Sequence, residues 1–181
     1  METVFYKPPV EEGARNLVRT MGSRGKIYKG RARPHPALKV MLDEQGRVMS
    51  SRADLALIFL EKPLESPGIP LADEDTRVGD SVIIAGYGYD EVADVFGWER
   101  RFCTNKITRL SLTEDERILI EQPGGHQYRQ DSGGPCLRQG EKGPEIVGIS
   151  SRWLGEGAAC TSIHGHLDWL REEVRRAETP D

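Results

Sequence analysis

Residues 128–135 read Tyr128-Arg129-Gln130-Asp131-Ser132-Gly133-Gly134-Pro135, a serine set between an aspartate and two glycines. A serine hydroxyl is a weak nucleophile at neutral pH, so it needs a base to take its proton and N–H donors to hold a developing oxyanion. The two glycines allow a tight turn and a close approach of the backbone to a substrate carbonyl. The motif therefore indicates acyl transfer through Ser132, although the same string also occurs in ordinary surface turns.

A second segment carries a single carboxylate at the head of an apolar run. Residues 53–60 read Ala-Asp-Leu-Ala-Leu-Ile-Phe-Leu, and the run after Asp54 predicts a buried strand. An aspartate held at such a strand end can orient a histidine and stabilise its charged form. The alternative is that Asp54 caps a loop before a core strand.

Two further segments predict strands that end in bends. Residues 78–88 read Val-Gly-Asp-Ser-Val-Ile-Ile-Ala-Gly-Tyr-Gly, and because no third glycine or helix-forming stretch follows, they do not fit a phosphate loop. Residues 146–151 and 160–163 predict two short strands that lead into a C-terminal helix, and the apolar residues 118–120 predict another short strand before them. In that helix, residues 167–176, we expect Leu167, Leu170 and Val174 to share one face and Glu172 to pair with Arg176.

In this order and spacing, the four segments resemble the chymotrypsin/trypsin-like family of serine endopeptidases, from about Pro34 to Val174. The resemblance implies an all-β fold of two antiparallel Greek-key β-barrels, the first incomplete, with a C-terminal α-helix. We expect residues 1–67 to form the incomplete first barrel, 68–77 the connection, and 78–181 the second barrel with the helix.

The resemblance also implies roles for individual residues. Ser132 matches the nucleophile and Asp54 the acid of a catalytic triad. Asp131 matches a buried carboxylate beside the nucleophile, and Ser151 opens the strand that pairs with substrate. The backbone N–H groups of Gln130 and Ser132 would form the oxyanion hole, where the family has a glycine in place of Gln130, so an altered backbone is expected there.

The implied substrate pocket combines two stretches of the chain: His126, Gln127, Ser151, Arg152 and Trp153. At the position of the pocket floor stands His126 and not an acid, so a preference for Lys or Arg is not supported. The side chain of Trp153 would narrow access to the pocket.

The general base is the main departure from the family, which places a histidine well upstream of the acid. The four histidines of this chain are His35, His126, His164 and His166, and His35 matches a His-Pro pair with no catalytic duty. One hypothesis is a serine endopeptidase whose N-terminal portion precedes Met1, since residues 17–22 resemble the strand after the histidine loop. Another is a non-catalytic homologue that acts as a binding or regulatory module. A third is an unrelated β protein with accidental motifs.

Composition restricts the function classes. The chain has 181 residues, a net charge of −4 and a pI near 5.7, which argue against a nucleic-acid surface. No apolar run approaches membrane-spanning length, and residues 1–5 lack the pattern of a signal peptide. We expect no cofactor, no metal and no membrane or nucleic-acid partner, but a protein or peptide substrate. Since the family is mostly exported, a signal upstream of Met1 would imply secretion or the periplasm.

The three cysteines, Cys103, Cys136 and Cys160, lack the paired short spacings of a zinc site. One disulfide plus one leftover thiol is the most that three can form, and the resemblance implies Cys136 as one partner. Reduced, buried roles for all three stay open.

Overall fold

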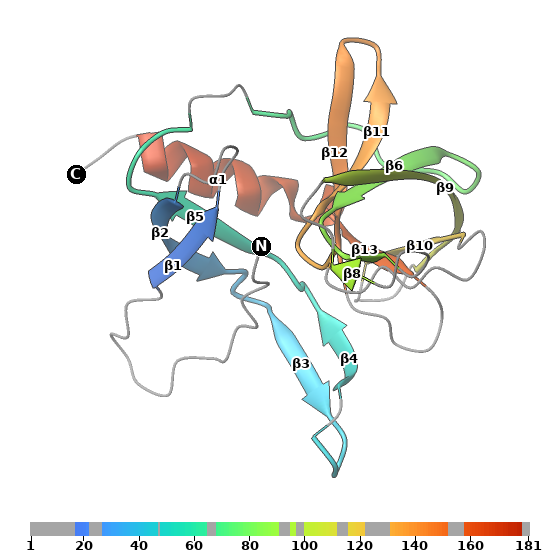
Figure 1. Ribbon diagram of the computed structural model, residues 1–181, viewed down its shortest axis with the longest axis horizontal. Helices are drawn as coiled ribbons and strands as arrows, with labels where there is room; N and C mark the ends of the chain where they lie inside the picture. The colour runs from blue at the N-terminus through green and yellow to red at the C-terminus, as the bar shows by residue number, and fades with distance from the viewer. Residues whose placement is uncertain are drawn as a thin grey trace.

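The computed structural model describes residues 17–21, 27–46, 48–64, 68–90, 95–96, 100–111, 116–121, 131–151 and 158–178. Within them the protein is mostly β-structure, with one α-helix, α1 (Leu167–Glu178), that follows a short 3-10 turn, η3 (His164–His166) (Figure 1). The strands predicted around residues 82–85, 118–120 and 146–149 are confirmed, and so is the C-terminal helix.

The N-terminal strands form two separate antiparallel units. β1 (Leu17–Met21), β2 (Ile27–Pro34) and β5 (Ala56–Leu60) make an open sheet in the order β1-β2-β5. β3 (Lys39–Leu42) and β4 (Val48–Arg52) pair only with each other in this part of the structure. Figure 1 shows this hairpin projecting away from both the sheet and the barrel.

The later strands close into a six-stranded antiparallel barrel in the order β10-β13-β12-β11-β6-β9. Their bounds are β6 (Ser81–Gly86), β9 (Arg101–Leu110), β10 (Arg117–Ile120), β11 (Pro135–Gly140), β12 (Gly143–Ser150) and β13 (Ala159–Ser162). β6, β9 and β10 run in sequence and β11 returns to lie beside β6, which is the Greek-key connection. The short pair β7 (Tyr89–Asp90) and β8 (Val95–Phe96) lies between β6 and β9 in the chain.

The barrel has a continuous apolar core, because alternate side chains of its strands point inward. Its buried members are Ala72, Val82, Ile84, Ile107, Ile118, Ile120, Cys136, Val147 and Cys160. Closure leaves no unpaired strand edge around this core, so the barrel satisfies both its hydrogen bonds and its apolar side chains internally.

Helix α1 packs between the barrel and the open sheet. Its Leu167 and Leu170 form a buried cluster with Ile163, against which lie Leu57 of β5 and Ile146 of β12. Val174 lies on the same side of the helix, as its spacing from Leu167 and Leu170 predicts, but it is 45% exposed and stays outside the buried cluster. Glu173 is buried instead, because Arg33 of β2 and Arg176 pair with its carboxylate.

One closed barrel, and not two, is therefore present in the described residues. The three strands β1, β2 and β5 are too few to close on themselves, so their sheet stays open. The division at residues 67 and 78 stays a prediction. Part of the predicted connection packs onto the barrel, since Ala72 N–H donates to the Ile146 carbonyl at 2.8 Å and Ala72 belongs to the core.

Candidate active site

Ser132 lies in a tight turn that comes directly before β11 and is hydrogen-bonded to the end of β12. Gly134 N–H donates to the Asp131 carbonyl at 2.9 Å, and Gly133 has a φ of +86°, which glycine adopts without strain. Gly133 N–H donates to the Ser150 carbonyl, and Ser150 N–H donates to the Gly134 carbonyl, both at 2.8 Å. The backbone that follows Ser132 is therefore held by β12.

The Asp131 carboxylate points back under this turn toward the Gly86-Tyr87-Gly88 bend. Gly88 N–H donates to Asp131 Oδ1 at 2.7 Å. A Cβ atom on Gly86 would overlap the same carboxylate, so only glycine fits there. Burial raises the pKa of Asp131, while the Gly88 N–H and the charge of Arg101 act to lower it. The Gly86-Tyr87-Gly88 bend thus binds the Asp131 carboxylate through the Gly88 N–H, and the absence of a side chain at Gly86 leaves room for it.

Asp54 lies at the edge of the open N-terminal sheet and contacts Ser151, which follows β12 of the barrel. It precedes β5 and follows Ala53, which is buried and has a φ of +46°; Leu55 N–H donates to the Ala53 carbonyl at 2.7 Å. The Asp54 Oδ2 atom accepts a hydrogen bond from Ser151 Oγ at 3.1 Å. This bond joins residues 97 positions apart and connects the open sheet with the barrel.

The Ser132 turn and Asp54 are attached to two consecutive residues. Ser150 bonds the Ser132 turn, and Ser151, the next residue, bonds Asp54. The Ser151 N–H donates to the Ala159 carbonyl at 2.9 Å, so β13 also holds this dipeptide. The catalytic roles of Ser132 and Asp54 stay predictions.

His35 comes directly after β2, and its backbone lies beside the residue that follows Asp54. Its N–H donates to the Leu55 carbonyl at 2.9 Å. Its ring packs edge-on against His166 and Trp169, with ring centroids 4.6 and 4.5 Å apart.

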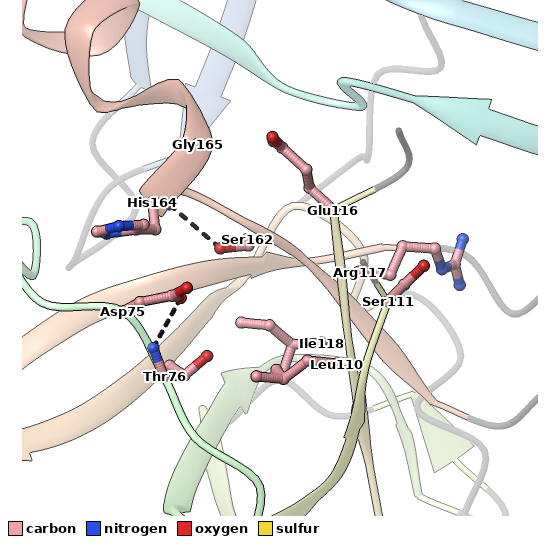
Figure 2. Close-up of a pocket in the computed structure, with 10 residues that line it drawn as sticks. All are labelled: Asp75, Thr76, Leu110, Ser111, Glu116, Arg117, Ile118, Ser162, His164 and Gly165. Carbon is pink, nitrogen blue, oxygen red and sulfur yellow. Dashed lines mark hydrogen bonds between the residues drawn. The ribbon is translucent and has the colours of Figure 1, made fainter. Parts of the chain in front are cut away.

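The other described histidines are also engaged elsewhere. His166 is buried, and its Nε2 lies 2.6 Å from Glu116 Oε2. His164 is exposed and lines a cavity of about 430 Å³ beside Ser162, Asp75 and the buried Thr76 (Figure 2). Neither Ser132 nor Asp54 lines this cavity. His126 lies outside the described residues, as do Gln127, Gln130, Arg152 and Trp153, so the predicted pocket and oxyanion roles stay predictions.

Sequence reasoning missed two residues of the site. Ala53 has a positive φ, a conformation that alanine rarely adopts, so the sequence gives no sign of it. Arg101 lies thirty positions before Asp131 and donates from Nη2 to the Gly88 carbonyl at 2.5 Å. No local motif marks Arg101; only the pairing of Arg101 with Gly86 across β6 and β9 brings it to the bend.

All three cysteines are free thiols, so the disulfide expected at Cys136 is absent. Cys136 and Cys160 are fully buried in the barrel, and Cys103 is half-buried. Hydrogen bonding to Cys136 and burial both raise the pKa of the Cys160 thiol. In the described residues, no cluster of three or more His, Cys, Asp or Glu side chains forms a metal site.

Comparison with known proteins gives a partial similarity. No family model matches the chain. Over 147 residues it is 26% identical to phenoloxidase-activating factor 3 of Holotrichia diomphalia; the aligned part covers 67% of this chain and 42% of that protein. The chain thus spans less than half the length of this relative. In the described part of the chain, no helix is long and apolar enough to cross a membrane.

Proposed function

We propose that this chain is the nucleophile-bearing part of a trypsin-like serine endopeptidase. The observation that supports this most is the Ser151–Asp54 hydrogen bond beside the Ser132 turn. It joins an acid that precedes β5 to Ser151, and the preceding residue, Ser150, bonds the Ser132 turn. We expect the substrate to be a protein or peptide. We also expect the protein to be secreted or periplasmic, as most members of the family are.

In this reaction Ser132 Oγ attacks the carbonyl carbon of a peptide bond, while a base takes the hydroxyl proton. The base then delivers that proton to the leaving amine as the C–N bond breaks, which leaves an acyl-serine. Water hydrolyses the ester and restores Ser132. Asp54 would orient the base and stabilise its charged form, and the N–H groups of Gln130 and Ser132 would hold the oxyanion. Because His35 and His166 pack against each other, the reaction requires a base from outside the described residues.

A second candidate is a non-catalytic homologue that acts as a binding or regulatory module. The placement of His35 favours it, since this histidine lies beside Asp54 in the sheet yet turns its ring toward α1. A protein of this kind keeps the turn around Ser132 but binds peptides without turnover.

A fluorophosphonate probe separates the two candidates. In the reaction the Ser132 oxygen forms a bond to phosphorus, fluoride leaves, and the serine proton passes to the base. If a side chain outside the described residues of this chain supplies the base, the folded chain should label at Ser132 at least about a hundredfold faster than the urea-unfolded chain, since positioned acid–base assistance contributes that much or more. Ser132→Ala should abolish labelling and Ser81→Ala, at the exposed start of β6, should leave it unchanged.

Equal labelling of folded and unfolded protein would reject the peptidase proposal for this chain and favour the binding module. The reading frame upstream of Met1 supplies an independent test. An in-frame histidine loop there supports the endopeptidase, and a stop codon immediately before Met1 counts against it.

A further inference from the structure

Three groups from separate parts of the barrel meet beside the Ser132 turn. The Asp131 carboxylate accepts from Gly88 N–H at 2.7 Å, and the Gly88 carbonyl accepts from Arg101 Nη2 at 2.5 Å. The N–H of Gly88 thus bonds an anionic side chain, and its carbonyl bonds a cationic one. The two bonds are charge-assisted, and such bonds are stronger than those between neutral groups.

The Asp131 carboxylate needs a partner, because it is half-buried and burial disfavours its charged form. The Gly88 N–H supplies one hydrogen bond, and Arg101 is the side chain whose charge acts on Asp131 to favour ionisation. An arginine suits this place, since its planar guanidinium keeps its charge at all relevant pH values and can serve several acceptors at once.

The strand register explains why Arg101 and not its neighbour reaches the bend. Arg101 is paired with Gly86, the last residue of β6, so its backbone lies next to the bend that Asp131 enters. Arg100 turns elsewhere, with its guanidinium carbon 5.3 Å from the centre of the Phe102 ring. Two arginines adjacent in sequence therefore have different surroundings, and only one contacts Gly88.

We propose that Arg101 is the positioning residue of the Ser132 turn: its guanidinium holds the Gly86-Tyr87-Gly88 bend and supplies the positive charge that keeps Asp131 docked beneath the nucleophile. The proposal rests on the function proposed above for Ser132. The three groups of this network lie just after β6, at the start of β9 and directly before β11.

The experiment compares Arg101→Gln, Arg101→Lys and the matched control Arg100→Gln in the full chain. The pKa of Asp131, measured from its side-chain carboxyl carbon resonance, should rise in Arg101→Gln because a favourable positive charge is lost. Arg101→Lys should restore part of the shift, and Arg100→Gln should match the wild type. Exchange of the Gly88 amide hydrogen should become about tenfold faster in Arg101→Gln, in keeping with the loss of a charge-assisted bond.

The same variants are then labelled with the fluorophosphonate probe across pH. In the wild type, labelling should fall at low pH as Asp131 is protonated, and in Arg101→Gln this fall should move to higher pH. A general loss of packing would lower labelling at all pH values and would not be rescued by lysine. A fall that stays at the wild-type pH would count against the positioning role.

An unchanged Asp131 pKa and unchanged Gly88 exchange in Arg101→Gln would overturn the proposal. If Arg101→Gln does not fold, the test uses Arg101→Lys with and without Asp131→Asn; independent energies of unfolding for the two sites would also overturn it. Should the wild type fail to label at all, the proposed peptidase function fails, while the Asp131 and Gly88 measurements still decide the role of Arg101.

Discussion

The closed barrel and the open N-terminal strands differ in how they bury apolar side chains. Val82 and Ile118 of the barrel are at most 1% exposed, whereas Met41 of β3 is 49% and Met49 of β4 is 60% exposed. The barrel buries its own apolar core, whereas the strands β1 to β5 rely on contacts with α1 and the barrel for their burial. We call β1 to β5 the dependent region. The candidate site combines residues of the barrel with Asp54 of this dependent region.

Polar, aromatic and apolar contacts attach the dependent region to the rest of the molecule. Arg33 pairs with buried Glu173 of α1 at 2.6 Å, His35 packs on Trp169, and Asp54 bonds Ser151. Leu57 of β5 packs against the apolar cluster of α1. The helix α1 thus supports both β2 and β5.

The largest effect should come from removing core volume in the barrel. Ile118→Ala should lower the free energy of unfolding by about 2–5 kcal/mol, because it deletes buried methyl groups and leaves a cavity. Met41→Ala on the exposed hairpin should change it by less than about 0.5 kcal/mol. Urea unfolding measures both. Equal losses at the two sites would mean that the hairpin is as well packed as the barrel, which would break the comparison.

Removing the charge of Glu173 should weaken the attachment of the open sheet. We expect Glu173→Gln to cost about 1–3 kcal/mol, less than a fully buried pair, because the Arg33 side chain is 51% exposed. The matched control is Glu172→Gln, whose pairs with Arg175 and Arg176 lie at the surface and should contribute less than about 0.5 kcal/mol. Amide exchange in β2 and β5 should rise with Glu173→Gln and stay unchanged in the barrel.

Ser151→Ala removes the hydrogen bond from Ser151 Oγ to Asp54 Oδ2. A hydrogen bond to a charged acceptor contributes about 1.5–3 kcal/mol, and because this pair is only partly buried the loss in unfolding free energy should lie at the lower end of that range. A double-mutant cycle with Asp54→Ala isolates the pair, and a coupling energy near zero would show that the bond does not hold the acid. Ser81→Ala, on the exposed start of β6, is the control.

The smallest effect should be a pH dependence at the His35 contact. Burial, and then the charge of His166, lower the pKa of His35; Arg52 also lowers it and Glu116 opposes the change. The unfolded chain then takes up the proton first, so this contribution to stability is present above a pH of about 6.5 and is lost as the pH falls below it. His35→Gln should flatten the fall in urea midpoint between pH 7.5 and 5.5. The exposed His164→Gln should not, and a wild-type midpoint that rises on acidification would contradict the assignment.

Local patterns predicted most of the elements and part of the site. Apolar runs located β5, β6, β10 and β12, and the heptad-like spacing located α1, because burial demands such periodicities. The exposure of Val174 was missed, since an apolar residue on a helix face carries no sign that a neighbouring glutamate takes its place in the interior. A disulfide was also expected where the barrel instead buries thiols.

The sequence by itself determined the chemistry of the nucleophile turn and the strand ends at which Asp54 and Ser151 lie, since turns and strands follow from neighbouring residues. The tertiary structure alone decided that Ser151 bonds Asp54, that the ring of His35 faces α1, and that Arg101 and not Arg100 serves the Gly88 bend. Those outcomes depend on strand register and on which face meets the helix. Register couples residues far apart in the chain, and the local pattern of residues carries no record of that coupling.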